Sequence, residues 1–406
     1  MSTRGAGLRR AGRFIVLSLK VGVLLPSAVF ASIEPPGGYD GRSLAMGGTG
    51  AAYIHNAAAI YHNPAGLEGI ERFSATLDFT GLSPRKTTPV NGDQTSVASD
   101  ASFYPLFMVA AGYRLMDRVV VGVAAYPTSG FGAGYSKVAS LGGQDLSFRI
   151  FLIEAAPAVA VTIAEHFSVG LGYRITYARE SRHAPTGPGT VGDQVLTGTN
   201  FAGFHLGLHY QPDPDWEFGL TYRSQVTASL SGNTTVSNAQ GSQVLPTVSS
   251  FSSPHALRFG VSHALLNGKA LVAMDLKYLL YSLSNKQLVF TTPGGTTTTP
   301  LNWNDVFSAS VGFEYRLSNC ALRAGYAISQ SATPDSTANY FTAPPGVINS
   351  FHAGLGLLYD NWEFDLGGLY AFGGKDDVQP SQASQSAAGR YHLDTWMFGL
   401  SATFKL

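Results

Sequence analysis

The 406-residue chain has little charge, a single cysteine and no long apolar run. Charged residues make up 13% of it, about half of the roughly 25% found in ordinary soluble domains. The 26 basic residues balance 26 acidic ones, so there is no basic surplus for binding nucleic-acid phosphates. The lone Cys320 excludes a disulfide framework and a cysteine-rich zinc module. Without an apolar run of about 18 residues, a membrane-spanning helix is excluded as well.

Glycine and aromatic residues are abundant instead. Glycine accounts for 47 of the 406 residues, or about 12% against the usual ~7%. Phe, Tyr and Trp together also reach 12%. Many aromatic and few charged residues exclude a disordered chain. Hydrophobic residues stand at an ordinary 45%. Ordinary hydrophobicity with low charge and no apolar run predicts apolar side chains that alternate along the chain and face lipid.

Residues 1–31 have the layout of a secretory signal peptide. Arginines precede an apolar stretch from Val21 to Phe30, and Val29 and Ala31 occupy the −3 and −1 positions of a small-residue cleavage site. The stretch is about half of the ~20 residues that a membrane span needs, which favours a cleaved signal over an anchor. Removal of the whole signal peptide takes away five of the 26 basic residues and no acidic one, so the mature chain carries a net charge of −5.

Most of the remaining chain alternates apolar and polar residues at period two, as β-strands do. In segment 167–177 one face is wholly apolar and has aromatic ends, and the other carries Ser, Gly, Arg and Thr. Similar segments begin at Trp216 and Trp362, and another includes Trp396. Soluble sandwiches seldom place Arg, Glu and Gly opposite such a face over ten residues. Because a β structure in lipid must close on itself to pair its backbone, the pattern predicts a membrane β-barrel.

Fourteen segments alternate in this way. They are residues 72–82, 104–114, 118–127, 148–164, 167–179, 200–210, 215–228, 255–265, 270–283, 305–317, 320–330, 350–360, 362–373 and 393–405. Very short connections alternate with connections of about twenty residues, such as 180–199, 229–254, 284–304 and 331–349. Short periplasmic turns and long extracellular loops are typical of bacterial outer-membrane barrels with even strand numbers. We therefore predict an all-β fold, in which residues 72–406 form a 14-stranded antiparallel transmembrane barrel in a Gram-negative outer membrane.

Residues 32–71 precede the first strand and do not alternate. The Ala-rich piece 56–61 fits a short helix that ends before Asn63-Pro64, since proline disfavours helix at the preceding residue. The apolar residues of the segment favour a packed structure over a loose periplasmic tail. We predict that residues 32–71 form a hatch of short helices that plugs the barrel lumen.

Two motifs in this segment read Met-Gly-Gly-Thr-Gly-Ala at residues 46–51 and Asn-Pro-Ala-Gly-Leu at residues 63–67. They resemble the N-terminal hatch of the FadL/TodX (OmpP1) family of outer-membrane transporters of long-chain fatty acids and aromatic hydrocarbons. Strand segments 218–224, 322–330 and 352–359 resemble the same family. The residues that carry the hatch motif are Gly47, Gly48, Asn63, Pro64, Ala65 and Gly66.

The chain departs from the family pattern in two places. Leu406 replaces the usual terminal aromatic residue, which leaves Phe404 as the expected signal for the barrel-assembly machinery. His55-Asn56 replaces the more acidic residues that are common at this point of the hatch, and this leaves the substrate open.

The resemblance implies passive uptake by a monomer with no cofactor and no energy source. A hydrophobic ligand crosses the lipopolysaccharide layer, is captured by extracellular loops, enters a pocket under the hatch and leaves sideways into the membrane through a gap at a kinked strand. The candidate ligand contacts are Leu44, Met46, Tyr53, Ile54, Phe131, Tyr135, Leu141 and Phe148, although local packing explains each of them equally well. The kink candidates are Pro127, Gly130, Gly132 and Pro157; proline removes a ladder donor, so Pro157 should form a bulge.

Evidence for other chemistry is weak. Charged residues of both signs at inward positions are expected to pair with one another and tether the plug. We expect no enzyme and no metal site, because the chain has no Gly-x-Ser-x-Gly motif and no His pair at metal spacing on a predicted helix. Besides the passive channel for hydrophobic molecules, two alternatives stay open: a surface scaffold or binding barrel of similar shape without transport, and an open polar porin.

Overall fold

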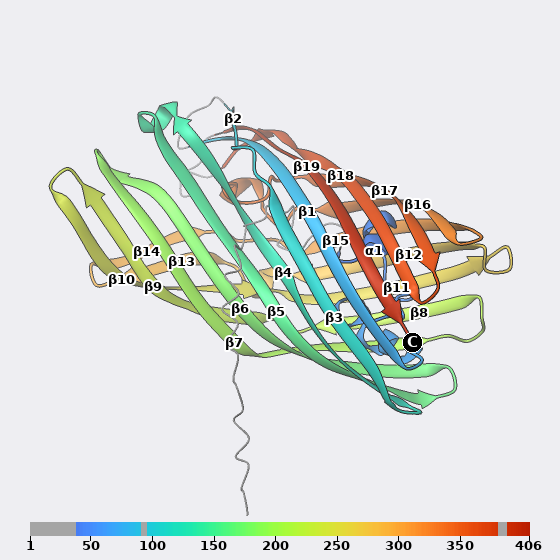
Figure 1. Cartoon of the computed structure of the whole chain (residues 1–406). Coiled ribbons are helices and arrows are strands. Elements are labelled where there is room, and N and C mark those ends of the chain that lie inside the picture. The colour runs from blue at the N-terminus through green and yellow to red at the C-terminus, as the bar shows by residue number, and fades with distance from the viewer. Residues whose placement is uncertain (1–37, 91–95, 381–387) are drawn as a thin grey trace, which may run out of the picture.

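The computed structural model describes residues 38–90, 96–380 and 388–406 (Figure 1). The predicted signal peptide, residues 1–31, lies outside this part of the chain. The described strands form one antiparallel sheet, and β1 (Phe73–Pro89) pairs with β19 (Gly389–Lys405) to close it into a barrel. No helix in the described ranges is long and apolar enough to cross a membrane.

The barrel has fourteen spanning strands, as predicted. Two of them are interrupted, since β8 (Trp216–Arg223) continues into β9 (Val226–Asn238), and β10 (Gly241–Ser253) into β11 (His255–Leu265). The remaining spanning strands are β3 (Tyr104–Met116), β4 (Val119–Val138), β5 (Gln144–Ala164), β6 (Phe167–Gly187), β7 (Thr190–Tyr210), β12 (Ala270–Leu280), β15 (Val306–Leu317), β16 (Cys320–Gln330), β17 (Val347–Tyr359) and β18 (Trp362–Val378). Three short strands belong to the long connections: β2 (Ser96–Ala98), β13 (Gln287–Thr292) and β14 (Gly295–Pro300).

The predicted long loops are partly wrong. Residues 180–199 and 229–254 are not loops, because β6, β7, β9 and β10 extend through most of them as long hairpins (Figure 1). Beyond the lipid both faces of a hairpin meet water. The apolar outer face therefore ends there while the backbone ladder continues, and the alternation no longer marks the strand.

The outer surface carries the apolar face of the strands. Leu171 and Tyr173 of β6 are 47% and 43% exposed, while the next residue, Arg174, is buried on the lumen side. Phe398 and Leu400 of the last strand are exposed in the same way. An apolar exterior around a polar and glycine-containing interior is the arrangement of an outer-membrane barrel.

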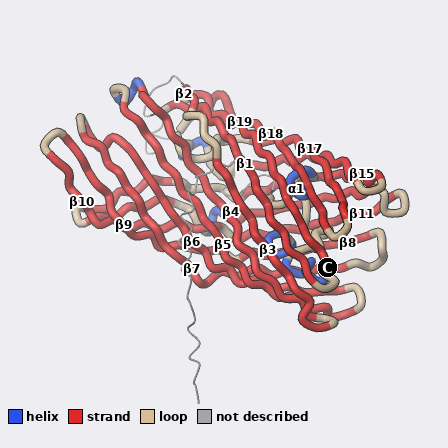
Figure 2. Tube along the Cα trace, viewed as in Figure 1, coloured by secondary structure: helices blue, strands red, loops and turns tan. Residues whose placement is uncertain are grey.

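The hatch consists of short helices inside the barrel, shown in blue within the red strands in Figure 2. They are α1 (Gly41–Ala45), α2 (Ala59–His62) and the 3-10 helix η1 (Pro64–Gly69). α2 ends at Asn63, where the sequence places the end of a helix. The Asp40 side chain caps α1 by accepting a hydrogen bond from the Ser43 amide at 2.7 Å.

Inward-facing glycines of the wall make room for the hatch backbone. A Cβ atom on Gly219 of β8 would lie 1.9 Å from the Ala51 carbonyl oxygen, and one on Gly325 of β16 would lie 2.2 Å from the Gly47 nitrogen. Contacts this short leave no space for a side chain. The high glycine content of the sequence therefore has a structural reason, which is close approach between wall and hatch.

Candidate functional site

Asn63 connects two parts of the hatch to the barrel wall. Its buried Nδ2 donates hydrogen bonds to the carbonyl oxygens of Ala51 at 2.8 Å and Leu208 of β7 at 2.9 Å. Its Oδ1 accepts a hydrogen bond from the Ala65 amide at 3.1 Å, which caps η1. Pro64 and Ala65 press against wall glycines, and Gly66 lies where a Cβ would be 2.4 Å from the Ile54 carbonyl oxygen.

The other two motif glycines form a turn. Gly47 and Gly48 have φ angles of +74° and +76°, which residues with a side chain rarely adopt. A Cβ on Gly47 would also lie 2.6 Å from the carbonyl oxygen of Val311 in β15. Both positions thus need glycine for the turn, and Gly47 also needs it for contact with the wall.

Charged residues of the lumen tie the hatch to the wall, as the sequence predicts. Arg42 of α1 donates from Nε and Nη2 to both carboxylate oxygens of Glu314 in β15, at 2.8 and 2.9 Å. Asp275 of β12 accepts hydrogen bonds from the amides of Gly50 and Ala51 at 3.1 and 3.2 Å. The hatch is therefore attached at several points around the barrel, and not only at its C-terminal end.

Replacing Asn63 with Ala should loosen the hatch. The substitution removes three buried hydrogen bonds and leaves carbonyl groups unpaired, which we expect to cost roughly 1–3 kcal/mol of hatch docking. Limited proteolysis follows the population of the open form, so cleavage within the hatch should become about 5- to 150-fold faster. Asn361→Ala in an exposed turn is the matched control. An equal cleavage rate in both variants would show that Asn63 does not hold the hatch.

An aromatic cluster fills the long-loop end of the lumen. Phe131 of β4 contacts four rings, with centroid distances of 5.7 Å to Phe148, 5.4 Å to Phe251, 5.3 Å to Trp303 and 6.3 Å to Phe341. Phe341 lies 4.6 Å from Phe148 and completes the group. We call these five residues the mouth cluster. All are buried although they lie near the loops, so together they form an apolar surface screened from water.

The connection between β16 and β17 covers the mouth cluster. The buried Lys86 ammonium at the end of β1 donates to the carbonyl oxygens of Tyr340, at 3.1 Å, and Thr342. The Tyr135 hydroxyl donates to the same Tyr340 oxygen at 2.8 Å. Tyr135 and Leu141, two of the predicted ligand contacts, thus belong to a neighbouring apolar group that supports this cover.

The predicted ligand contacts of the hatch are packed against the wall or against the hatch itself. Leu44 and Met46 lie within van der Waals reach of wall glycines such as Gly399 and Gly312. Tyr53 bonds to Thr49, and its ring lies 4.8 Å from the Arg42 guanidinium. Ile54 is buried beside η1. Leu44 and Met46 thus lie between hatch and wall, whereas Tyr53 and Ile54 contact other parts of the hatch. All four belong to a different apolar cluster from Phe131 and Phe148.

Three tyrosines meet where the hatch faces β4. The Tyr61 ring lies 5.1 Å from both Tyr39 and Tyr126, measured between centroids. We call these residues the tyrosine cluster. Burial raises the pKa of the Tyr39 phenol well above its usual value. A neutral ring surface at this place can contact an apolar molecule.

The ladder between β3 and β4 ends before the strands do. Val109 pairs with Ala125, but in the described structure residues 104–108 have no partner on β4 and pair only with β1. β4 itself stays paired with β5, and the register of that ladder shifts directly after Pro127. We call residues 104–108 and 126–130 the β3–β4 seam. Unpaired backbone is costly in lipid, so a seam in a spanning strand calls for a functional reason.

The predicted kink residues of β4 lie at this seam. Pro127 has no amide hydrogen to donate, and the residue after it, Thr128, has no partner in the β5 ladder. Such an extra residue bends a strand and increases its twist. Gly130 and Gly132 follow, and a Cβ on Gly132 would lie 2.1 Å from the Phe148 carbonyl oxygen. The irregular stretch of β4 therefore begins where the strand separates from β3.

The bulge expected at Pro157 is wrong. The ladder between β5 and β6 is interrupted at Ala156 and Pro157, but Ala155 pairs with Ile175 and Ala158 with Gly172 in the same register. Pro157 keeps its pairing with β4 on the other side. Because Pro157 has no amide hydrogen, Ala156 and Pro157 are unpaired in the ladder with β6, but no extra residue is inserted.

A second unpaired stretch lies between β7 and β9 and is bridged by backbone and side-chain hydrogen bonds. Residues 198–204 and 224–230 have no ladder partners across it within the described residues. However, the Ser224 amide donates to the Phe204 carbonyl at 2.9 Å, and Asn200 Nδ2 donates to the Thr227 carbonyl at 2.8 Å. No side-chain hydrogen bond of this kind crosses the β3–β4 seam in the described structure. The two interruptions therefore differ in how firmly they are closed.

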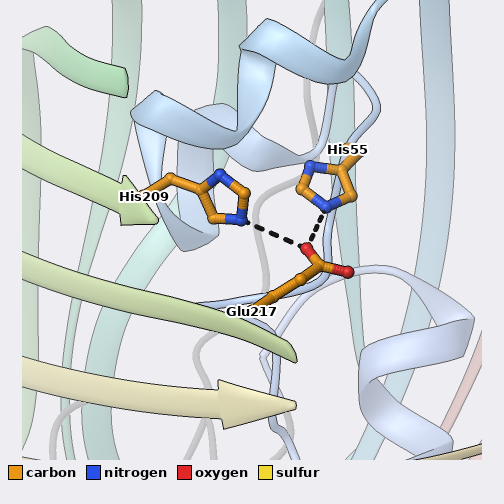
Figure 3. A group of neighbouring side chains, drawn as sticks. All are labelled: His55, His209 and Glu217. Atoms are coloured by element: carbon orange, nitrogen blue, oxygen red, sulfur yellow. Dashed lines mark hydrogen bonds and ion pairs between the residues drawn. The ribbon is translucent and has the colours of Figure 1, made fainter. Parts of the chain in front are cut away.

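Two histidines and two glutamates meet at the short-turn end of the hatch, and Figure 3 shows three of them, His55, His209 and Glu217. His55 Nε2 lies 2.5 Å and His209 Nε2 3.1 Å from Glu217 Oε2. His209 Nδ1 contacts the Glu68 carboxylate. Sequence spacing missed this group because its members come from the hatch, β7 and β8. Sequence analysis also missed Phe251, Trp303 and Phe341, because they come from separate parts of the chain. The one feature that could have indicated them is their position as aromatic residues in Thr- and Pro-rich segments.

Comparisons with known proteins agree with this architecture. The family model described as outer membrane protein transport protein (OMPP1/FadL/TodX) matches residues 37–406. A search of curated proteins found no match. Solved structures with the same fold include a Pseudomonas aeruginosa FadL homologue, with 15% identity, a TM-score of 0.77 and coverage of 94% of this chain and 99% of that one.

Two toluene transporters are similar to about the same degree. TodX of Pseudomonas putida is 19% identical, with a TM-score of 0.69 and coverage of 92% of this chain and 100% of that one. TbuX of Ralstonia pickettii is 19% identical, with a TM-score of 0.70 and coverage of 91% and 99%. The family match over nearly the whole chain, on a closed 14-stranded barrel, shows that this chain belongs to the FadL/TodX family of outer-membrane transport proteins.

Proposed function

We propose that this protein is a passive channel that carries hydrophobic molecules from the cell exterior into the outer membrane. The observation that carries the proposal is the β3–β4 seam, an unpaired stretch of a spanning strand with aromatic surface on both sides of its bend. Tyr126 before the bend belongs to the tyrosine cluster, and Phe131 after it belongs to the mouth cluster. Five residues of strand span about 16 Å, so β4 joins both surfaces to the seam.

The path begins at the extracellular end. A ligand that partitions into the mouth cluster leaves water for an apolar surface, which is favourable by roughly 25 cal/mol per Å² buried. It then passes along β4 to the tyrosine cluster beneath. At the seam it enters the hydrocarbon core without crossing the lumen. Each step follows apolar surface, so no energy source is needed.

The hatch argues against the open polar porin. Leu44, Met46 and Ile60 of the hatch are at most 1% exposed, and the hatch backbone touches glycines around the wall. The packed hatch occupies lumen space that an open porin keeps filled with water. A lateral exit for the ligand needs no water-filled channel.

A cationic cavity beside the tyrosine cluster favours a fatty acid over a neutral hydrocarbon. Arg223, Arg258 and Lys277 line it together with Tyr61 and Thr221. Arg223 also lies 5.6 Å from the Tyr61 ring centroid. Arg223 pairs with Glu154 at 2.7 Å and Arg258 with Asp275 at 2.5 Å. A carboxylate head group would gain charge-assisted hydrogen bonds by sharing these cations, whereas toluene offers no group for them. The apolar chain of a fatty acid would extend along the tyrosine cluster.

Uptake by proteoliposomes tests the proposed function. Mature protein is reconstituted, and transfer of labelled oleate and labelled toluene is measured with the full chain and with residues 38–66 deleted, alongside ion conductance. We expect saturable transfer of oleate without steady conductance for the full chain, and leak conductance after the deletion. Binding of oleate without transfer would indicate the scaffold, and steady conductance of the full chain without binding would indicate the porin.

Replacing Lys277 with Met should separate the two ligand classes. A hydrogen bond to a charged group contributes roughly 1.5–3 kcal/mol, so oleate binding should weaken about tenfold or more while toluene binding is unchanged. Equilibrium binding to the purified variant is the measurement. The control is Lys269→Met, which removes the same charge from an exposed turn. Equal losses for oleate and toluene would contradict a carboxylate site.

A further inference from the structure

Two imidazoles and a carboxylate converge where the hatch meets the periplasmic end of the wall (Figure 3). His55 belongs to the hatch, His209 to β7 and Glu217 to β8. One ligand atom of each lies within 4.8 Å of those of the other two. None of these side chains lines the mouth cluster or the tyrosine cluster, so ligand passage does not account for them.

The donor atoms suit a small metal ion. Both histidines point Nε2 at the same oxygen of Glu217, at 2.5 and 3.1 Å (Figure 3). Zinc bonds to imidazole nitrogen and carboxylate oxygen at about 2.0–2.1 Å, which in a tetrahedral site puts ligand atoms roughly 3.3–3.4 Å apart. Both observed separations are somewhat shorter than this value, and all three ligand atoms lie within 4.8 Å of one another. Small side-chain rotations therefore suffice to place all three donors around one ion.

A second set of contacts orients one ligand. His209 Nδ1 is held by the Glu68 carboxylate, whose other oxygen accepts a hydrogen bond from Ser168. The imidazole of a metal-binding histidine usually donates its second N–H to a carboxylate, which fixes the tautomer and raises the basicity of the coordinating nitrogen. The buried His209 has this partner already in place, with Nε2 directed at the other donors.

The site is also reachable and balanced in charge. The side chains of His55 and Glu217 are 31% and 16% exposed, so an ion and a water ligand can enter from the periplasmic side. A divalent ion with one carboxylate ligand carries a net charge of +1, which Glu68 offsets. Two imidazole nitrogens with one carboxylate suit zinc and its neighbours, whereas calcium and magnesium prefer oxygen ligands only.

We propose that His55, His209 and Glu217 bind one divalent transition-metal ion of the zinc type, with Glu68 as the positioning residue for His209. The ion joins the hatch to β7 and β8. It adds to Asn63 and Arg42 a further attachment that depends on metal supply in the periplasm.

Zinc titration of the purified mature protein tests the site. The protein is stripped with chelator in detergent, its folding is checked by heat-modifiable gel mobility, and ZnCl₂ binding is measured by calorimetry. We expect one equivalent of zinc in the wild type and in the control His166→Ala, which changes an exposed histidine of a neighbouring turn. His55→Ala and the isosteric Glu217→Gln should lose this binding, and Glu68→Gln should weaken it about 10- to 100-fold. Zinc should slow proteolysis of the hatch in the wild type but not in His55→Ala.

The opposite results are equally clear. A folded wild-type protein that takes up no zinc overturns the proposal, as does a folded Glu217→Gln variant that binds zinc as tightly as the wild type. Zinc binding that survives in both His55→Ala and Glu217→Gln but is lost in His166→Ala would place the ion elsewhere. Magnesium or calcium binding with equal affinity would contradict the assigned class of metal.

Discussion

Replacing Ser129 with Trp is expected to slow the delivery of ligand into the bilayer about 5- to 150-fold while capture at the mouth cluster is unchanged. Ser129 lies on β4 directly after the bulge, its side chain is 3% exposed, and its hydroxyl has no hydrogen-bond partner among the described residues. An indole at this position fills the lumen side of the β3–β4 seam. Overpacking of this kind typically costs roughly 1–3 kcal/mol, and the same increase in the barrier to passage gives that range of rates.

The control for this prediction lies on the same strand. Ala125 is exposed on the outer face at the last paired position of the ladder, so Ala125→Trp adds the same bulk to the lipid side. Its delivery rate should stay within about twofold of the wild type, because aromatic residues are tolerated on the apolar exterior. Transfer rates of labelled oleate in proteoliposomes measure both variants. Equal rates for Ser129→Trp and the wild type would mean that ligand leaves by another route.

Replacing Phe131 with Ala should weaken capture of the ligand. Phe131 contacts Phe148, Phe251 and Trp303, so its removal opens the centre of the mouth cluster. An aromatic pair contributes about 0.5–1.5 kcal/mol beyond its buried area, and the ligand loses both this contact and the ordered rings around it. We expect the apparent affinity to fall roughly ten- to thirtyfold, with the maximal transfer rate less affected.

Phe107→Ala is the matched control for Phe131→Ala. Phe107 is 52% exposed on the outer face and contacts Phe79 there. Its loss should leave the concentration dependence of uptake unchanged. If both variants gave the same dependence, the mouth cluster would be packing only, and ligand would enter the barrel without it.

The strand number and the closed barrel could be predicted from the sequence because lipid imposes one rule on every spanning strand. Segments such as 167–177 must be apolar on the outer face, and the lumen side is free to carry glycine and charge. The rule ends with the lipid, which is why the extensions of β9 and β10 read as loops. The end of α2 at Asn63 could also be predicted, because the following proline constrains the backbone locally.

The candidate site could be predicted only where one segment determines it. Pro127 marks the bend of β4 because a missing amide hydrogen is visible in a sequence, but the loss of pairing with residues 104–108 depends on a different strand. The mouth cluster joins β4 to two loops that follow it by more than 150 residues. Leu44 and Met46 are typical apolar hatch residues in sequence, and only the wall glycines opposite them show that they pack.

Where the ligand emerges tests the central claim most directly. Proteoliposomes are prepared with brominated lipid in the bilayer and serum albumin trapped in the interior, and a fluorescent fatty acid is added outside. Lateral release predicts that quenching by the brominated lipid precedes any transfer to albumin, and that the quenching phase slows in Ser129→Trp but not in Ala125→Trp. Arrival at the trapped albumin without prior quenching would show passage through the lumen and would contradict an exit at the β3–β4 seam.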